Sequence, residues 1–466
     1  MNKKFFAALA SATMAFTASG SIAVFADDFV EEKTPVVDGN VVKPEETVKW
    51  NKENFGDLAT KKDEVNPNVT INTLTVTNGE VKVKDLENVT TITLGADFKG
   101  EVKGLEYFTK LTSFTAEAGT LENKTLDFSA NKVLATLSVT NAADLTGVVL
   151  PEPFIDTEDG DKEVYSLATL TLENTALTSL DLSAQDTLGT VTVTDNKNLK
   201  EVTVQHGTKK TPREYATLDF SANNLETVNL DNVAITTKLN LSNNHIGVLD
   251  LSKTTVDGSN VDLKGQKFYI SEKFGTVTLT EIFENFDVEK VTDTTGFNKE
   301  TGVLTLDDNG ATYKYKTGVA PLEVTLEKAN PMNRLYNPNS GEHFYTADNA
   351  EKEALVNLGW NDEGYGWVAP KKADGVKDVY RLYNPNAGDH HYTMNKGERD
   401  TLVTYGWKDE GTGWKSAANT ATPVYRQYNP YANGAGAHNY TTDKAENDHL
   451  VSLGWTPEGK AWFALQ

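Results

Sequence analysis

The residues best suited to bind a ligand recur three times between residues 331 and 466. Each copy carries an Arg-x-Tyr-Asn-Pro run, and a His-x-Tyr-Thr run follows it. The guanidinium, amide and imidazole groups can hydrogen-bond to a polar ligand, and the phenol rings can stack on a flat one. The candidate ligand-binding residues are Arg334, Tyr336, Asn337, His343, Tyr345, Arg381, Tyr383, Asn384, His390, Tyr392, Arg426, Tyr428, Asn429, His438 and Tyr440.

The same residues also have a structural interpretation. Buried polar groups need hydrogen-bond partners, so the arginines, asparagines and histidines, with Glu363 and its equivalents, could satisfy one another inside the fold. Tyr336 and Tyr345, with their equivalents, could stack on a ligand or fill a core or hinge. The tryptophans at 360, 407 and 455, and those seven residues after each, predict core packing because buried aromatic area dominates core energetics.

The spacing of the motifs indicates a closed domain. The step from His to the first Trp is 17 residues in every copy, and the second Trp follows after 7. Each copy predicts two short strands, a helix that Thr346 or Asp348 caps and Gly359 ends, and a hairpin from Trp360 to Ala369. Four strands in each of three 47-residue copies predict a β-trefoil-like domain over residues 330–466.

These motifs also resemble a known family. The run Arg334-Leu-Tyr-Asn-Pro-Asn-Ser-Gly-Glu-His-x-Tyr-Thr, followed by Gly359-Trp-x-x-Glu-Gly-x-Gly-Trp, resembles the repeat domain at the ends of secreted cell-wall hydrolases and surface proteins of Gram-positive bacteria. The resemblance covers about residues 331–466. It implies a non-catalytic attachment domain directed at a cell-wall or host glycan.

A second repeat occupies residues 67–266. Phrases such as Leu126-Asp-Phe-Ser-Ala-Asn131 recur, and from Leu218 on they step by 10 or 11 residues. Two strands per coil give a coil of about 21 to 22 residues, within the range of leucine-rich repeats. The alternation predicts leucines inside and small polar residues outside. The asparagine after each strand predicts a ladder of hydrogen bonds at the turns, through Asn131, Asn196, Asn223 and Asn244.

The segment from Gly104 to Phe114 resembles the opening coil of bacterial surface leucine-rich repeats, those of internalin-like proteins included. This resemblance implies a leucine-rich-repeat β-solenoid, although helices are nearly absent from the coils. Solenoids of this kind hold partner proteins on an extended curved sheet. Residues 267–329 predict a β-rich cap at the end of the coils, so the fold class we expect is mainly β.

The N-terminus predicts export. Lys3 and Lys4, the apolar run that follows and Val24-Phe25-Ala26 together form a signal peptide over residues 1–26. Residues 27–66 are rich in Glu, Lys, Pro and Val without a period and predict a linker, with one short helix near residues 54–62. No sorting signal ends the sequence. We therefore expect a secreted or cell-surface protein with no membrane insertion.

Composition excludes several classes of function. The formal charge of −23 argues against nucleic acid and anionic membranes, which attract clustered Lys and Arg. The chain has no cysteine, which excludes thiol catalysis and cysteine-bound zinc. His-Glu-x-x-His, Gly-x-Ser-x-Gly and phosphate-loop motifs are absent from the sequence. We expect no catalysis, no metal and no cofactor.

Two functions remain open. In the first, the C-terminal domain attaches the protein to cell-wall or host glycan while the solenoid presents a face to a host or bacterial surface protein, as in an adhesin. In the second, the chain is a structural or scavenging glycan-binding component without a specific protein partner. A cell-wall hydrolase of unfamiliar type is the weakest alternative.

Overall fold

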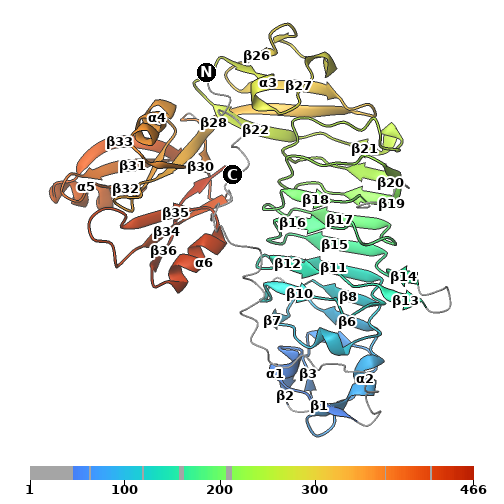
Figure 1. Ribbon diagram of the computed structural model, residues 1–466. Coiled ribbons are helices and arrows are strands. Elements are labelled where there is room, and N and C mark those ends of the chain that lie inside the picture. The colour runs from blue at the N-terminus through green and yellow to red at the C-terminus, as the bar shows by residue number, and fades with distance from the viewer. Residues whose placement is uncertain are drawn as a thin grey trace. The chain divides into compact units, whose positions relative to one another are not determined.

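The computed structural model describes residues 46–61, 64–117, 120–156, 162–205, 212–372, 374–419 and 422–465, and these residues are mainly β-strand (Figure 1). The expected signal peptide, residues 1–26, lies outside them. The described chain divides into two compact units. The first, called the sheet unit, consists of residues 46–266 and 314–324. The second, called the repeat unit, consists of residues 267–313 and 325–465.

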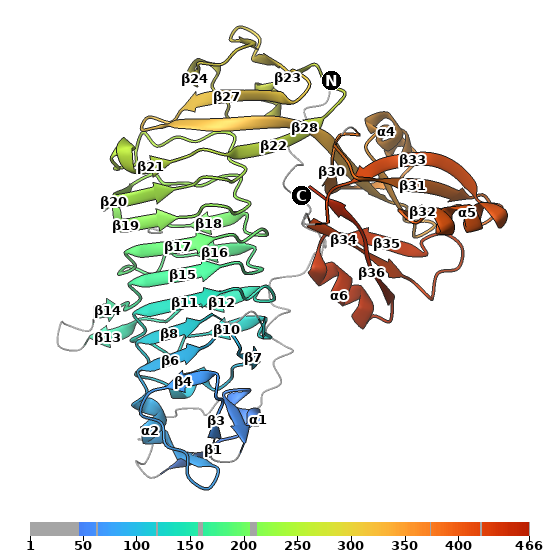
Figure 2. The ribbon, with the colours of Figure 1, turned by 180° about the vertical axis from the view of Figure 1, so that it is seen from behind.

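A nine-stranded sheet forms one face of the sheet unit (Figure 2). All neighbours run parallel except the first pair, β4 and β6, which is antiparallel. Residues alternate between buried and partly exposed along these strands, so that Leu137 and Val139 point into the core. The strands in chain order are β4 (Val69–Ile71), β6 (Thr91–Leu94), β8 (Ser113–Ala116), β11 (Thr136–Thr140), β15 (Thr169–Glu173), β17 (Thr190–Thr194), β19 (Arg213–Asp219), β20 (Val233–Asn240) and β21 (Val261–Asp262).

Shorter strands form a second face of the same coils. They associate only in parallel pairs, β7 with β9, β10 with β12 and β16 with β18. The strands are β7 (Lys99–Gly100), β9 (Thr120–Leu121), β10 (Thr125–Asp127), β12 (Gly147–Val149), β16 (Ser179–Asp181) and β18 (Glu201–Thr203). An antiparallel hairpin, β13 (Phe154–Asp156) with β14 (Lys162–Val164), projects from the coil between β12 and β15.

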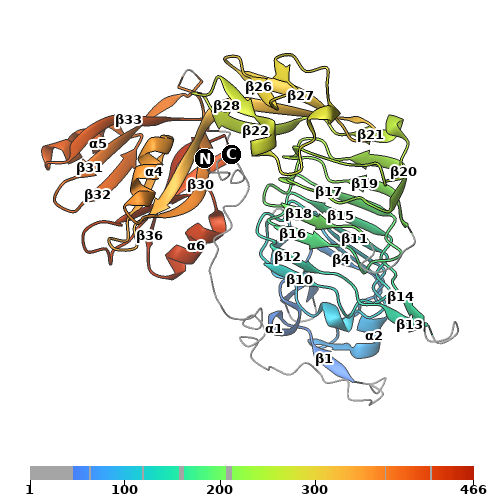
Figure 3. The same cartoon turned by 45° about the horizontal axis from the view of Figure 1, so that its top comes forward.

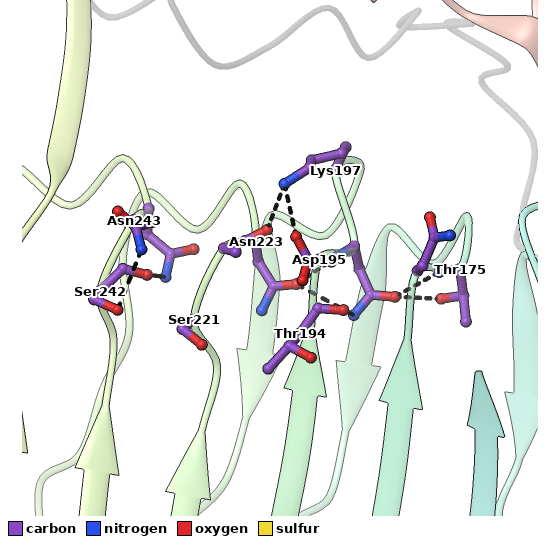
Figure 4. Close-up of polar contacts among 12 residues, drawn as sticks. Thr175, Thr194, Asp195, Lys197, Ser221, Asn223, Ser242 and Asn243 are labelled. Atoms are coloured by element: carbon purple, nitrogen blue, oxygen red, sulfur yellow. Dashed lines mark hydrogen bonds and ion pairs between the residues drawn. The ribbon is translucent and has the colours of Figure 1, made fainter. Parts of the chain in front are cut away.

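The predicted asparagine ladder is confirmed for Asn196, Asn223 and Asn244 but not for Asn131, which follows β10 on the second face and donates instead to the carbonyls of Leu105 and Phe108. Asn196, Asn223 and Asn244 each donate from Nδ2 to a backbone carbonyl of the preceding coil, and each accepts a backbone N–H at Oδ1. Thr175 takes the ladder position before Asn196, and Gln266 takes the one after Asn244 (Figure 4 labels Thr175 and Asn223). The turns would otherwise leave these buried backbone groups unpaired, which is costly.

The prediction of a linker over residues 27–66 is wrong for its described part. Trp50, Phe55 and Leu58 are almost fully buried, and the Phe55 ring lies 6.2 Å from that of Phe108 in the first coil. Three apolar side chains spaced in a polar segment are enough to bury it, and they cap the open end of the coils. The elements here are β1 (Thr47–Lys49), α1 (Lys52–Phe55), β2 (Ala59–Lys61), β3 (Glu64–Val65), β5 (Glu80–Lys82), α2 (Val83–Glu87) and the 3₁₀ helix η1 (Leu105–Tyr107).

The boundary predicted at residue 329 falls inside one strand. β28 runs without interruption from Pro321 to Tyr336, and residues 267–313 belong to the same compact unit as the three repeats. Apolar and polar residues alternate from Leu322 to Glu327, and the strand continues past residue 329 because almost every residue from Lys328 to Leu335 is buried. The short helix η2 (Gly258–Asn260) lies in the last coil, before the expected cap. The other elements of the expected cap are β22 (Gln266–Ser271), β23 (Thr276–Thr278), α3 (Leu279–Ile282), η3 (Val288–Lys290), β24 (Val291–Thr292), β25 (Phe297–Asn298), β26 (Val303–Thr305) and β27 (Gly310–Lys316).

Each repeat contains three strands and a helix rather than four strands and a helix (Figure 3). The hairpin expected from Trp360 to Ala369 is one strand, because Gly364, at φ +83°, lies in a bulged strand and not in a chain-reversing turn. The described strands form no closed barrel, so the twelve-stranded trefoil is not confirmed. The repeats are β28–β29 (His343–Thr346)–α4 (Asn349–Asn357)–β30 (Asn361–Ala369), β31 (Lys377–Asn384)–β32 (Asp389–Thr393)–α5 (Lys396–Thr404)–β33 (Lys408–Ser416), and β34 (Thr422–Tyr428)–β35 (His438–Thr441)–α6 (Lys444–Ser452)–β36 (Thr456–Ala464).

One turn of the coils stores backbone strain. Ala222 has φ +59°, a left-handed conformation that costs a residue with a Cβ about 1–2 kcal/mol. Ala130 occupies the same place in an identical Asp-Phe-Ser-Ala-Asn sequence without a positive φ. We expect Ala222→Gly to stabilise the protein by up to ~1 kcal/mol and Ala130→Gly to destabilise it by ~0.5–1 kcal/mol. Urea denaturation followed by backbone circular dichroism measures both, and a loss of stability in Ala222→Gly would contradict the strain.

Candidate functional site

Three tyrosines join the repeats through a closed ring of hydrogen bonds. The backbone N–H of Tyr345 donates to the hydroxyl of Tyr392, that of Tyr392 to the hydroxyl of Tyr440, and that of Tyr440 to the hydroxyl of Tyr345, each at 3.2 Å. All three side chains are fully buried. The prediction that they bind a ligand is therefore wrong. They are core residues, because their hydroxyls are the acceptors for otherwise unpaired backbone donors of the neighbouring repeat.

Beneath this ring, the second tryptophan of each repeat fills the core. The indoles of Trp367, Trp414 and Trp462 contact one another with ring centroids 5.4–5.5 Å apart, and all three are buried. The first tryptophan of each repeat is only half-buried, so the prediction of core packing holds for one set and not for the other. The half-buried set is Trp360, Trp407 and Trp455.

A second ring, of ion pairs, surrounds the first. Arg334 of the first repeat donates two hydrogen bonds to Glu446 of the third, at 2.9 and 2.7 Å. Arg381 contacts Glu351 of the first repeat, and Arg426 contacts Glu398 of the second, at 3.0–3.3 Å. Each glutamate is the third residue of a helix, α6, α4 or α5, where a negative charge is favoured. The predicted arginines are therefore committed to closing the domain.

The same arginines also anchor three equivalent surface clusters. The Nε of each arginine lies 2.8 Å from a glutamate of its own repeat, and a histidine lies 3.2–3.7 Å from that glutamate. A tyrosine ring covers the histidine with centroids 4.9–5.4 Å apart. These Tyr–His–Glu–Arg clusters consist of Tyr336, His343, Glu363 and Arg334; of Tyr383, His390, Glu410 and Arg381; and of Tyr428, His438, Glu458 and Arg426.

The outer members of each cluster reach solvent. The glutamate side chains are 30–34% exposed and the histidines 16–17%. Tyr428 is 40% exposed, and Tyr336 and Tyr383 are half-buried. Each cluster thus presents one side of a phenol ring, a carboxylate and an imidazole edge, all held from behind by an arginine that cannot move without breaking its second ion pair.

Burial and ion pairing set the charge states of these groups. Burial lowers the pKa of His343 and of His391, which favours their neutral forms. Burial alone would raise the pKa of Glu363 and of Glu446. A hydrogen bond from His343 to Glu363, and the hydrogen bonds and charge of Arg334 at both carboxylates, outweigh burial and lower the pKa of both. The carboxylates are therefore ionised at neutral pH, and they can accept hydrogen bonds but not donate them.

The predicted asparagines shape turns and do not reach the clusters' polar groups. Asn337 accepts hydrogen bonds at Oδ1 from the backbone N–H groups of Asn339 and Ser340. Asn384 does the same two and three residues on, and Asn429 accepts from the N–H of Tyr431. An asparagine before proline is a frequent turn-former for this reason. These residues are not available to a ligand through the atoms that the turns occupy.

Six glutamates that the candidate set leaves out hold the arginines and histidines in place. Glu363, Glu410 and Glu458 recur in each Glu-Gly pair, so the threefold repeat itself was a signal for them. Glu351, Glu398 and Glu446 also recur, but at the third position of a helix they resemble ordinary capping residues. No sequence pattern shows that each of them meets the arginine of another repeat.

The comparisons with known proteins cover the chain unevenly. Residues 331–465 match a family described as "Domain of unknown function (DUF5648)". No curated protein matches the chain. One similar solved structure is titled "Functional domain of InlJ from Listeria monocytogenes includes a cysteine ladder"; it shares 13% identity, covers 62% of this chain and 100% of its own, and has a TM-score of 0.16. A TM-score this low carries no argument about the fold. Within the described part of the chain, no helix has the length and apolar character needed to cross a membrane.

The tyrosine ring makes a direct prediction about stability. In Tyr392→Phe the buried N–H of Tyr345 loses its acceptor, which costs roughly 1–3 kcal/mol. Tyr405→Phe, at a side chain that is 75% exposed, should change stability by less than about 0.5 kcal/mol. Urea denaturation followed by tryptophan fluorescence measures both, since six of the seven tryptophans lie in the repeats. Equal stability of the two variants would show that the ring contributes nothing.

The ring of ion pairs predicts a loss of stability in acid. Burial opposes ionisation of Glu398, but hydrogen bonds from His391 and Thr393 and the charge of Arg426 lower its pKa to about 2. Because an unfolded glutamate has a pKa of about 4.3, the stabilisation is complete above that pH and is lost as the pH falls toward 2.

We therefore expect Glu398→Gln to cost roughly 1–3 kcal/mol at pH 7, and this difference from the wild type to shrink between pH 5 and pH 3. Glu353→Gln, at an exposed carboxylate of α4, is the matched control and should show little difference at either pH. Denaturant midpoints measured from pH 3 to pH 7 test this prediction. If the stability difference between the wild type and Glu398→Gln does not change with pH, Glu398 stabilises the protein through its shape and not its charge.

Proposed function

We propose that the protein is a secreted, non-catalytic surface-binding protein whose three Tyr–His–Glu–Arg clusters attach it to a glycan polymer. The observation that carries this proposal is the threefold repetition of a half-exposed phenol ring beside a carboxylate and an imidazole. A phenol ring offers an apolar face to the C–H side of a sugar, and the carboxylate accepts hydrogen bonds from vicinal hydroxyls.

Rigidity supports a binding role for the clusters. Each arginine is tied both to its own repeat and to a helix of another, so cluster geometry needs little ordering when a ligand arrives. Groups held in place before binding lose less conformational freedom, which improves affinity. The ligand class remains the one that the resemblance of the repeats to cell-wall attachment domains implies, a cell-wall or host glycan.

We infer further that the sheet unit is a leucine-rich-repeat β-solenoid. The in-register parallel pairing from β8 to β17 and the buried asparagine ladder both support this, because stacked coils with a polar residue at each turn are the structural logic of such repeats. The outward residues of the sheet, such as Ser138, Thr171 and Thr192, are small and polar. They form a surface that a protein partner could cover without displacing long side chains.

Multivalency determines how the proposal should be tested. Stacking and a few hydrogen bonds give single sites with a Kd in the millimolar range, about −4 kcal/mol each. Three such sites on a domain gain avidity on a polymer with repeated epitopes, by roughly 10²–10⁴. Insoluble peptidoglycan should therefore retain the mature protein, and soluble monomeric fragments of peptidoglycan should compete poorly for it.

We expect Tyr336→Ala, Tyr383→Ala and Tyr428→Ala to lower retention on peptidoglycan stepwise, by about tenfold for each site lost. Tyr405→Ala, which removes a more exposed ring outside the clusters, should leave retention unchanged. Sedimentation with the polymer and the melting temperature are measured on the same variants. If the triple variant keeps both its melting temperature and its retention, the clusters are not the glycan site.

A further inference from the structure

The second face of the coils has a gap that the first face does not. On the nine-stranded sheet, β11 and β15 pair in register over five residues. On the opposite face, β12 belongs to a pair with β10, and β16 to a pair with β18, but β12 and β16 do not pair with each other (Figure 2). The coil between them explains the break. β12 and β16 start 32 residues apart, at 147 and 179, whereas β10 and β12, like β16 and β18, start 22 residues apart.

The pairing that does exist shows which backbone groups face the gap. Gly147 donates its N–H to Lys124 of the coil before, and Val149 accepts from Phe128. Both backbone groups of one residue in a strand point to the same side, and those of the next residue point to the other side. The N–H and C=O groups of Val148 therefore point away from β10. Lys200 donates to Thr178, and Leu182 donates to Thr203, so by the same rule Ser179 and Asp181 direct their backbone groups away from β18. These two sets face each other across the gap.

Among the described residues, no hydrogen bond joins these groups. In the intact pairs, Thr146 donates to Lys124 and Lys200 to Thr178. The corresponding bond from Thr178 to Thr146 is not formed. The last backbone bond before the gap runs instead from Ala176 to Leu145, at 2.9 Å, and the first contact after it is from Gln185 Nε2 to the carbonyl of Pro151, at 3.0 Å. The gap is thus bounded at both ends and spans residues 146–150.

The gap contains a cavity of about 400 Å³. That size lies within the range of ligand pockets. Its floor is apolar, from Leu177 and Leu180, and its walls carry the polar groups of Thr146, Ser179 and Asp181. The gap therefore offers unpaired strand edges on two sides and an apolar floor that a side chain of valine or leucine size could cover.

We propose that this gap is a binding site for a short extended peptide segment of a partner protein, which adds a strand between β12 and β16. Strand addition gives affinity through main-chain hydrogen bonds and specificity through alternate side chains. The bounded length admits about five residues, or roughly 16 Å of strand. The side chain over Leu177 and Leu180 is apolar and no larger than leucine, and the segment carries no net negative charge because Asp181 lines the wall. This proposal does not depend on glycan binding by the repeats.

The first test uses amide hydrogen exchange in the free protein. The amides of Val148, Ser179 and Asp181 should exchange about 100-fold faster than that of Leu182, which donates within the β16–β18 pair. If they exchange as slowly as Leu182, the two strands are paired in solution and the proposal fails. Protection of these amides that rises with protein concentration alone would also overturn it, because the occupant would then be a second copy of this chain.

The second test adds a probe. The peptide acetyl-Lys-Glu-Val-Thr-Val-amide copies residues 200–204, which form β18 and its flanks. At millimolar concentration it should slow exchange at the three amides at least tenfold, and the same peptide N-methylated at its first valine should not. Binding of the methylated peptide with equal effect, or no effect of either peptide, would contradict strand addition.

A shortened coil provides the matched variant. Deleting the ten residues 156–165 restores the 22-residue step between β12 and β16 and should let the two strands pair. The three amides should then become slow to exchange without peptide, and the peptide should no longer bind. Val148→Pro, which removes one donor facing the gap, should weaken the peptide several-fold in the full-length coil while the melting temperature reports folding. Unchanged peptide binding in the folded deletion variant would place the site elsewhere.

Discussion

The buried N–H of one tyrosine in each repeat is the constraint on which the C-terminal structure depends. It lies too deep for water, and an unpaired backbone donor at that depth is costly. The hydroxyl that satisfies it belongs to the next repeat, and the third repeat returns the bond to the first. Two repeats would leave a donor without an acceptor, so closure of three is a condition of stability and not a consequence of packing alone.

This closure also explains the place of the surface clusters. The arginine that supports each cluster is held by a helix glutamate of another repeat, so cluster geometry depends on the same three-way contact that satisfies the tyrosines. Removing one arginine would leave a half-buried glutamate without its partner and would loosen both the core and the surface. Function and fold therefore share residues in the repeats. The tyrosines at 336, 383 and 428 can vary with less structural cost, because they lie on the outside of the arrangement.

The sequence predicted the two repeat regions, the mainly β composition, the helix caps such as Asp348 and the asparagine ladder, because each of these is a local pattern with a fixed period. It did not predict which side of a repeat faces the axis. Tyr336 and Tyr345 both lie on short strands of similar composition, yet one is half-exposed and the other fully buried. Only the pairing of β28 with β29 and β30 decides between them. Residues 46–66 were mistaken for a linker because three buried apolar side chains, Trp50, Phe55 and Leu58, have no repeating spacing.

In both units, buried backbone groups at the junction of two repeats need hydrogen-bond partners. The two units supply these partners in different geometries, and the difference has consequences for binding. In both, a polar side chain of one repeat satisfies the backbone of a neighbouring repeat, by an amide in the coils and by a phenol in the closed repeats. A closed ring cannot lose a member, so all three clusters keep nearly the same geometry. A linear ladder needs only neighbours. One enlarged coil can therefore break the second face between β12 and β16 while the ladder through Thr175 and Asn196 continues on the other side. The closed unit is suited to repeating one site, and the open unit is suited to placing a single different one.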